Sequence, residues 1–338
     1  MTAAAAVTDA QKPRFSLIIP VYKNEGSLPE LMAACAQLWT ELSRELEVVL
    51  VVDGSPDNCW KWLRDQLPSQ PFRSQLCLHS RNFGSFAAIR TGMSVASGRV
   101  FAVMAADLQE PISLARDFFR RIDAGEADVA VGVREGRSDP MLSGVSSRLF
   151  WWFYRKAVLP EIPAGGVDMF GCSRQVGEQL LALGERHSSL VGQLFWVGFR
   201  RIEVPYVRQP RRHGESAWSF SKKVRYLLDS VYAFSDLPIR ALKWLGGLSA
   251  AGGALVSLIV LTARLIGKIE VPGYTPIVLS ITVFGGLNAF GLGLVGEYVW
   301  RTFENTKGRP IAINARHEVF APVRAAAVAP VILEVRQS

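Results

Sequence analysis

The sequence lacks the short signatures of several common enzyme classes. It contains no GxxxxGK[ST] phosphate loop, no HExxH metalloprotease motif and no GxSxG nucleophile turn. Its four cysteines form no CxxC pair, and none has a histidine at zinc-ligand spacing. These absences remove the main support for P-loop, zinc-protease, serine-hydrolase and zinc-finger functions. We expect four free, mostly buried thiols in a reducing compartment, at Cys35, Cys59, Cys77 and Cys172.

Charged residues are also scarce. They make up 20% of the 338 residues, below the usual quarter, whereas hydrophobic residues make up 49%. This composition excludes a disordered chain, a coiled coil and a collagen-like fibre, and it disfavours a purely soluble enzyme. The net charge is +8, and most of the excess lies in residues 200–243, which hold ten basic and four acidic residues. Such a basic block is typical of chains that bind nucleic acid, anionic lipid or phosphate groups.

Two long apolar runs lie near the C-terminus. Residues 244–263 contain no charged side chain, and residues 277–300 contain only Glu297. Because about 20 apolar residues cross a bilayer as a helix, we predict transmembrane helices at 244–264 and 277–300. A pair of buried core helices is the alternative. A GxGxxG motif lies inside the second run without a preceding strand, so we interpret its glycines as helix-packing residues.

The flanks of these runs predict how the chain is placed. The N-terminal residues 1–13 have no signal-peptide core and are expected to be flexible. Lys and Arg around the runs favour both chain ends in the cytosol, with residues 301–338 as a cytosolic tail. Residues 219–243 precede the first run, and the apolar residues at 224, 227, 228, 231 and 234 share one helical face, so we predict a juxtamembrane helix in the membrane interface. An ordinary surface helix is the alternative. Residues 149–158 are a second interfacial candidate, with core packing as the alternative.

Residues 14–218 alternate apolar strands with helical patterns. Strand–helix alternation with near-continuous apolar strands is typical of a mostly parallel sheet covered on both faces, so the predicted fold class is α/β. In such sheets ligands bind beyond the carboxyl ends of the strands, where Asp53 and Asp107 follow two strands closely. We predict strands at 15–21, 46–52, 100–105 and 129–133, and helices at 28–44, 86–96 and 114–124.

Five short motifs occur in order before the apolar runs: SLIIPVYKNEGSLPEL, VVDGSPDN, RNFGSFAAIRTGM, MAADLQEP and RRHGESAW. Together they resemble family 2 glycosyltransferases, and in particular the polyprenyl-phosphate sugar transferases such as dolichol-phosphate mannose synthase and the bactoprenol glucosyl transferases. The resemblance covers about residues 14–310. It implies a GT-A type domain, a nucleotide-sugar donor with UDP-hexose favoured, and a polyprenyl phosphate acceptor. It also implies a bacterial inner (plasma) membrane location with the catalytic domain in the cytosol.

The resemblance assigns donor-binding residues to the first two strand ends. Pro20, Tyr22 and Glu25 lie at or just beyond the end of the first strand, and Asp53 ends the second. Side chains there could bind the base and ribose of a nucleotide by hydrogen bonds. Asp53 and Asp57 could instead be capping or turn residues.

The arginines are assigned to phosphate groups, because a planar guanidinium offers paired donors to phosphate oxygens. Arg134 and Arg137 follow a later strand and suit the donor diphosphate. Arg211, Arg212 and Ser216 lie just before the membrane-associated segments and suit the acceptor phosphate. For each arginine a solvated basic face is the alternative.

Asp107 and Gln109 match the last Asp and the Gln of the family's Asp-x-Asp-x-Gln stretch. Oxygen ligands there suit Mg²⁺ or Mn²⁺ shared with a diphosphate, which would stabilise charge on the leaving nucleotide. Ala105 stands where the family commonly has the first Asp. Either water and the diphosphate complete the metal shell, with help from Glu110, or metal affinity is weakened. Asp168 matches an Asp that the family carries near the acceptor, with a structural turn residue as the alternative.

The predicted reaction needs no general base, because a lipid phosphate is already an anion at neutral pH. The site then needs positioning and charge stabilisation, and direct displacement inverts the anomeric configuration. The predicted catalytic residues are Asp107, Asp168 and Arg211. A family 2 transferase that extends a lipid-linked or cell-surface polysaccharide remains an alternative, although its usual QxxRW signature is absent. A catalytically weakened membrane scaffold is the other, and only Ala105 favours it.

The apolar runs also predict assembly. In lipid, helices associate through small residues, and polar side chains such as Asn288 and Glu297 need partners. We therefore expect a homo-oligomer, with a tetramer as one candidate, and no nucleic-acid partner; packing of the two helices within one chain is the alternative. The small residues at four-residue spacing are Gly247, Ala251, Gly285, Ala289 and Gly293.

Overall fold

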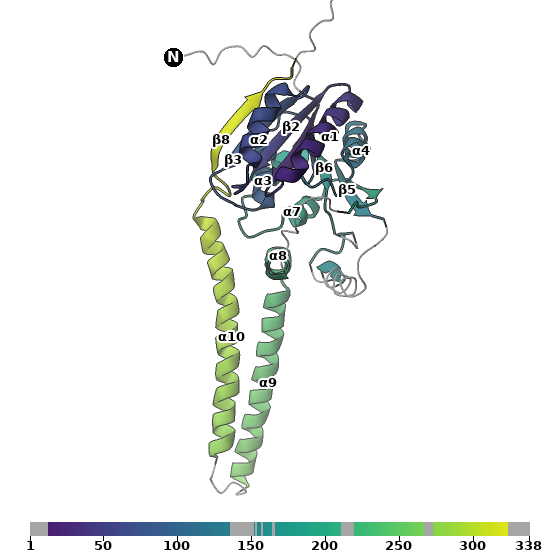
Figure 1. Ribbon diagram of the computed structural model, residues 1–338. Helices are drawn as coiled ribbons and strands as arrows, with labels where there is room; N and C mark the ends of the chain where they lie inside the picture. The colour runs from purple at the N-terminus through teal and green to yellow at the C-terminus, as the bar shows by residue number, and fades with distance from the viewer. Residues whose placement is uncertain are drawn as a thin grey trace, which may run out of the picture.

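The computed structural model describes residues 13–135, 152, 154–156, 158–163, 166–210, 220–266 and 273–323. These residues form a sheet domain from which two long helices extend (Figure 1). Most of the predicted N-terminal extension and residues 324–338 of the predicted tail lie outside the described residues.

The strands of the described residues form a single eight-stranded sheet in the order β7-β5-β6-β4-β1-β2-β3-β8. β6 runs antiparallel to β4 and β5, and β8 runs antiparallel to β3, whereas the other neighbours are parallel. The prediction of a mostly parallel α/β sheet is confirmed. The bounds are β1 (Phe15–Val21), β2 (Leu46–Val52), β3 (Arg73–His79), β4 (Val100–Val103), β5 (Val129–Arg134), β6 (Phe170–Ser173), β7 (Arg201–Tyr206) and β8 (Asn314–Phe320).

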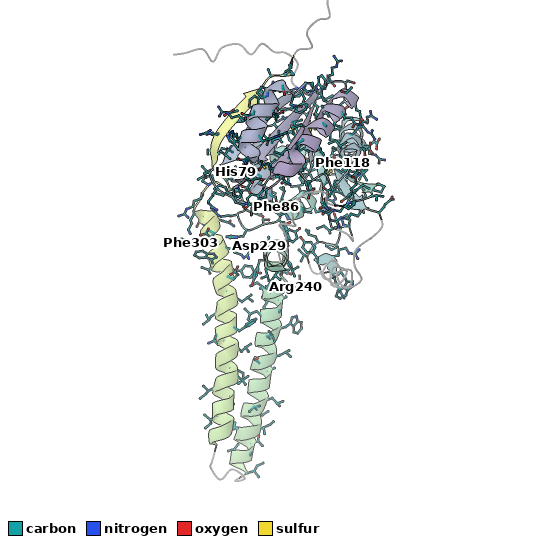
Figure 2. All side chains as sticks on the ribbon, viewed as in Figure 1. His79, Phe86, Phe118, Asp229, Arg240 and Phe303 are labelled. Carbon is teal, nitrogen blue, oxygen red and sulfur yellow. The ribbon has the colours of Figure 1, made fainter. Side chains whose placement is uncertain are left out.

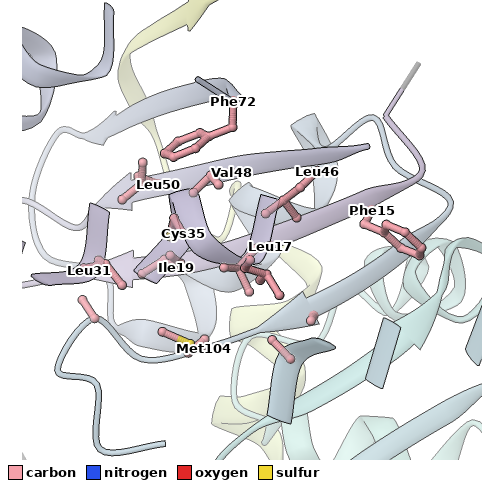
Figure 3. Packing of buried hydrophobic residues seen from close by; sticks show 14 of the residues in the cluster. Phe15, Leu17, Ile19, Leu31, Cys35, Leu46, Val48, Leu50, Phe72 and Met104 are labelled. Atoms are coloured by element: carbon pink, nitrogen blue, oxygen red, sulfur yellow. The ribbon is translucent and has the colours of Figure 1, made fainter. Parts of the chain in front are cut away.

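Helices cover both faces of this sheet, as the continuous apolar strands predict. On one face, Leu17 and Ile19 of β1 pack with α1, α2 and α4 (Figure 3). On the other face, Ile18 packs with α3, α6 and α7. The bounds are α1 (Leu28–Glu41), α2 (Cys59–Gln66), α3 (Ser85–Val95), α4 (Ile112–Asp123), α6 (Arg174–Ala182) and α7 (Leu190–Trp196).

A buried polar network joins the amino ends of the central strands to the C-terminal strand. Glu47 is fully buried and accepts hydrogen bonds from Ser16 Oγ at 2.9 Å and Gln75 Nε2 at 2.7 Å. Gln75 Oε1 lies 2.8 Å from His317 Nε2 of β8. The residues predicted as the start of a tail therefore include a strand that returns to the edge of the sheet beside β3 (Figure 1).

In the described residues between β7 and β8 there are three helices: α8 (Phe220–Phe234), α9 (Leu237–Leu265) and α10 (Tyr274–Thr306). α9 and α10 run side by side away from the sheet (Figure 1), with large apolar side chains such as Leu255, Ile259 and Ile281 more than half exposed. None of the helices within the described residues has the length and hydropathy that a membrane crossing requires. The prediction of transmembrane helices at 244–264 and 277–300 is therefore not supported, although helices lie at both positions.

The two interfacial candidates have different outcomes. The segment predicted as one juxtamembrane helix, 219–243, is divided between α8 and the first turns of α9, and Val231 of α8 is buried against the domain. In the second candidate, Tyr154 is fully buried and stacks on Tyr226 of α8, which agrees with core packing, whereas Trp152 is exposed.

α10 is joined to α8 by an ion pair. Arg301 donates to Asp229 of α8 at 2.9 Å and to Glu297 at 2.8 Å, and it lies over the ring of Tyr232. Asp229 and Phe303 mark this junction in Figure 2. Glu297 therefore has its partner within its own helix, so its charge no longer argues for a second chain.

Candidate active site

Asp53 ends β2, as predicted, but its carboxylate is engaged inside the fold. Its side chain is buried, and Oδ1 lies 2.8 Å from His79 Nδ1, while Phe83 N and Gly84 N donate to the carboxylate at 2.8 and 2.7 Å. His79 Nε2 is in turn 2.9 Å from Thr91 Oγ1. Asp53 therefore fixes the turn at residues 83–84 that precedes α3. A direct contact with the nucleotide remains a prediction.

The turn after Asp53 needs glycine. Gly54 has a φ of 57°, and a Cβ there would collide with the backbone of Arg81. Only a residue without a side chain fits such a left-handed turn at this close approach. The loop after β2 and the loop after β3 are therefore packed backbone to backbone.

The loop after β1 is locked to the loop after β2. Lys23 adopts a φ of 55°, and its N–H donates to Ser55 Oγ at 2.7 Å. Glu25 accepts from Asn58 N at 3.1 Å, and Glu25 N donates to Asp57 at 3.3 Å. The predicted donor residues of this strand, Pro20, Tyr22 and Glu25, are part-buried or exposed beside this reciprocal lock.

The loop after β4 holds the predicted metal ligands. Leu108 between them has a φ of 55°, a left-handed conformation that is unusual for leucine and concentrates at functional sites. Asp107 Oδ1 accepts a bond from Gln109 N at 3.3 Å. The Gln109 side-chain oxygen accepts a hydrogen bond of 2.6 Å from Arg208 Nη2.

Asp168 joins the site because β6 is antiparallel to its neighbours. Phe170 at the start of β6 pairs with Val103 near the carboxyl end of β4, so Asp168 reaches the edge where the parallel strands end. Its Oδ2 accepts from Arg134 Nε at 2.5 Å and from Tyr206 OH at 2.8 Å.

Asp168 shifts the pKa values of the two side chains that donate to it, Tyr206 and Arg134. Burial raises the pKa of the Tyr206 hydroxyl, and the charge of Asp168 raises it further. Burial opposes the charge of Arg134, but the bond to Asp168 raises the pKa of its guanidinium overall. Arg134 is thus a permanent cation, held in place at the strand edge.

Glu110 and Arg208 belong to the same cluster. The Glu110 side chain is 3% exposed and lies 3.6 Å from Arg208 Nε. Burial raises the Glu110 pKa to about 7, as do the charges of Asp168 and Asp107, while Arg208 opposes the shift. The sequence motif predicts only an auxiliary role for Glu110, and Arg208 is one of the ten basic residues of the block at 200–243. The only signal for Arg208 is its position two residues beyond β7.

The chemistry of this cluster fits a divalent cation with few protein ligands. In the described part of the chain, no group of three or more His, Cys, Asp or Glu side chains could hold a metal. Asp107 and Gln109 contribute hard oxygen atoms, the type that Mg²⁺ and Mn²⁺ prefer, and Mg²⁺ commonly keeps water and phosphate ligands. Glu110 Oε2 is buried and has no hydrogen-bond partner within the described residues, which adds negative charge nearby. Arg137, Arg211, Arg212 and Ser216 lie outside the described residues.

Known proteins are similar to this chain along most of its length. A family model described as glycosyl transferase family 2 matches residues 16–176. A prophage bactoprenol glucosyl transferase homolog of Escherichia coli is 30% identical, covering 90% of this chain and 99% of its own. The chain belongs to glycosyltransferase family 2. The bactoprenol glucosyl transferase of Shigella phage SfII is also 30% identical to this glycosyltransferase, covering 88% of this chain and 96% of its own. The resemblance carried by the five motifs is confirmed.

Solved structures of other glycosyltransferases superpose on this enzyme with low TM-scores. A mannosyltransferase from Pyrobaculum calidifontis, solved with GDP-Man and Mn²⁺, is 16% identical, with a TM-score of 0.43 over 89% of this chain and 91% of its own. Glucosyl-3-phosphoglycerate synthase from Mycobacterium tuberculosis, solved with Mn²⁺, UDP-glucose and phosphoglyceric acid, is 12% identical, with a TM-score of 0.45 over 60% of this chain and 73% of its own.

Proposed function

We propose that this glycosyltransferase transfers a hexose from a nucleotide sugar, with UDP-hexose favoured, to polyprenyl phosphate with inversion. The observation that carries the proposal is the charged cluster at the carboxyl edge of the sheet, where Arg134, Asp168 and the Asp107–Glu110 loop meet. The names of the bactoprenol glucosyl transferase relatives support this acceptor class. The product is a polyprenyl-monophosphate sugar.

The two sides of the site have different tasks in this proposal. The loops after β1 and β2 hold the base and ribose, with Pro20, Tyr22 and Glu25 at the surface and Asp53 fixing the turn behind them. Asp107 and Gln109 would hold Mg²⁺ or Mn²⁺, which supplies positive charge to the diphosphate leaving group. Arg134 and Arg137 add fixed positive charge for the same phosphates.

The acceptor phosphate attacks the anomeric carbon directly. As an anion it needs orientation rather than deprotonation, so Asp168 serves to place the sugar and Arg134 instead of acting as a base. Arg211, Arg212 and Ser216 bind the acceptor phosphate in this proposal. Replacing their charges would raise the KM for lipid more than the KM for nucleotide sugar.

The location and assembly are also proposals. The enzyme works at the cytosolic face of a bacterial plasma membrane, with both chain ends in the cytosol, and the exposed apolar side chains of α9 and α10 contact lipid. A Cβ at Gly247, Gly285 or Gly293 would meet no described atom within 4 Å, so these positions do not face the neighbouring helix. They remain accessible to a second copy in a homo-oligomer, which cross-linking would detect.

One experiment tests the function. Membranes containing the full chain are incubated with undecaprenyl phosphate and a panel of UDP-, GDP- and dTDP-sugars, and the lipid product is identified by mass. A monophosphate-linked hexose supports the proposal, and the anomeric coupling of the product tests inversion. Sugar incorporation only into an existing glycan favours the polysaccharide alternative. No product with any donor or acceptor favours the weakened scaffold that Ala105 suggests.

A further inference from the structure

Arg208 donates a hydrogen bond to the side-chain oxygen of Gln109, the same oxygen that a bound cation would need. Its Nη2 donates to Gln109 Oε1 at 2.6 Å, although the two residues are 99 positions apart in the chain. Mg²⁺ would sit about 2.1 Å from the same oxygen. A guanidinium and a divalent cation repel each other at such a separation, so the Arg208 bond and cation ligation by Gln109 compete.

A second acceptor for Arg208 lies within reach. Arg208 Nε is 3.6 Å from Glu110 Oε1, close enough for an ion pair but too long for a good hydrogen bond. Both Arg208 Nε and Glu110 Oε2 are buried without a hydrogen-bond partner in the described part of the chain. Each group therefore has unused bonding capacity directed at this cluster.

The backbone restricts the exchange to side chains. Gln209 N donates to Gln109 O at 2.8 Å, which ties the segment after β7 to the loop after β4. With the two segments joined, closing the ion pair requires the Arg208 side chain to shift by about 0.7 Å, down to an ordinary N–H···O distance. No hinge or loop opening is needed.

We propose that Arg208 gates the cation site by exchanging partners. It holds the Gln109 oxygen when no cation is bound, and it closes onto Glu110 when Gln109 turns to the cation. Arg208 and Glu110 are positioning residues that act through Gln109. The inference rests on the proposed metal-dependent function and specifies which residues control metal loading.

The test measures Mn²⁺ binding to the full-length chain without nucleotide, by electron paramagnetic resonance of the free ion. Arg208→Met removes the competitor, so it is expected to tighten Mn²⁺ binding about tenfold. Arg208→Gln is a second variant with the same expected direction. Arg200→Met is the matched control, because Arg200 pairs with Asp128 on the exposed surface, and it is expected to have no effect.

Two further variants separate the gate from simple electrostatics. In a Gln109→Ala background, Arg208→Met should no longer tighten binding, because the contested oxygen is gone. Glu110→Gln should weaken Mn²⁺ binding in the native background but not in the Arg208→Met background. A loss of equal size in both backgrounds would show that Glu110 acts on the cation directly and would overturn its role as the second partner.

The outcome is distinguishable from failure of the proposed function. Unchanged or weaker Mn²⁺ binding in both Arg208 variants overturns the gate, whether or not sugar transfer is observed. Tighter binding together with no sugar transfer to polyprenyl phosphate retains the gate and rejects the acceptor assignment.

Discussion

The two halves of the active site are built on different principles. In the first half, formed by the loops after β1 and β2, the polar side chains are hydrogen-bonded to other parts of the protein. Asp53 accepts hydrogen bonds from two backbone N–H groups and contacts a buried histidine, and Glu25 accepts a hydrogen bond from the backbone N–H of Asn58. The second half, formed by the ends of β4, β5 and β7 and the start of β6, gathers three carboxylates and two arginines. Buried atoms there lack hydrogen-bond partners within the described residues.

The first half is therefore characterised by a fixed shape, and the second half by its balance of charges. Satisfied hydrogen bonds make the first half rigid before any ligand arrives, which suits recognition of a planar base and a ribose. The second half contains more charge than its own partners neutralise, so its arrangement responds to phosphates and cations. Substitutions should therefore reduce stability in the first half and activity in the second.

The largest effect is expected for Asp107→Ala in the second half. Removing the carboxylate takes away the proposed cation ligand, and sugar transfer should fall by roughly a hundredfold or more. EDTA should act similarly on the native enzyme, and Mg²⁺ or Mn²⁺ should restore turnover. Asp117→Ala, on the outer surface of α4, is the control. Full turnover in EDTA would show that the second half works without a metal.

Asp53→Ala, in the first half, should reduce the stability of the fold. It leaves two backbone N–H groups and His79 without their acceptor in a buried position, at a cost of about 3 kcal/mol in the free energy of unfolding. Thermal unfolding measures this loss, and Asp236→Ala, in an exposed pair with Arg240, should change stability by less than about 0.5 kcal/mol. Unchanged stability in the Asp53 variant would contradict the rigid first half.

Ala105→Asp tests the second half by adding a carboxylate instead of removing one. It adds a carboxylate to the loop after β4, where the family commonly has one, and should tighten Mn²⁺ binding about tenfold while activity stays equal or rises. Mn²⁺ titration and the transfer assay measure the two effects. Weaker binding would show that a side chain at position 105 disturbs the oxygen ligands of the loop instead of adding one.

The smallest effect is expected at the thiols. Burial raises the pKa of Cys35, Cys59, Cys77 and Cys172 to about 12. The thiolate is the reactive form, so these cysteines should resist alkylation in the folded chain from pH 7 to pH 9, with four sites reacting after denaturation. Rapid labelling of the native chain would show that the core around them opens.

Features that depend on local pattern could be predicted from the amino-acid sequence alone. Continuous apolar runs predicted β1 and β2 with their observed bounds, and helical periodicity placed α1, α3 and α4 to within a few residues. The start of α8 was also predicted, but α8 ends at Phe234, well before the predicted bound of 243. The ordered motifs identified the family. These features are readable because strand burial and helix amphipathicity repeat along neighbouring residues.

Strands and side-chain partners that depend on contacts between distant segments became visible only in the folded structure. Four strands, β3, β6, β7 and β8, were not predicted. Buried polar residues interrupt the apolar pattern of β3, and β8 depends on hydrogen bonds from its neighbour β3. Spacing alone also could not show that Asp53 turns toward His79, that Arg301 reaches Asp229, or that Arg208 reaches Gln109. A side chain's partner depends on which strands lie side by side, and long-range pairing sets that order.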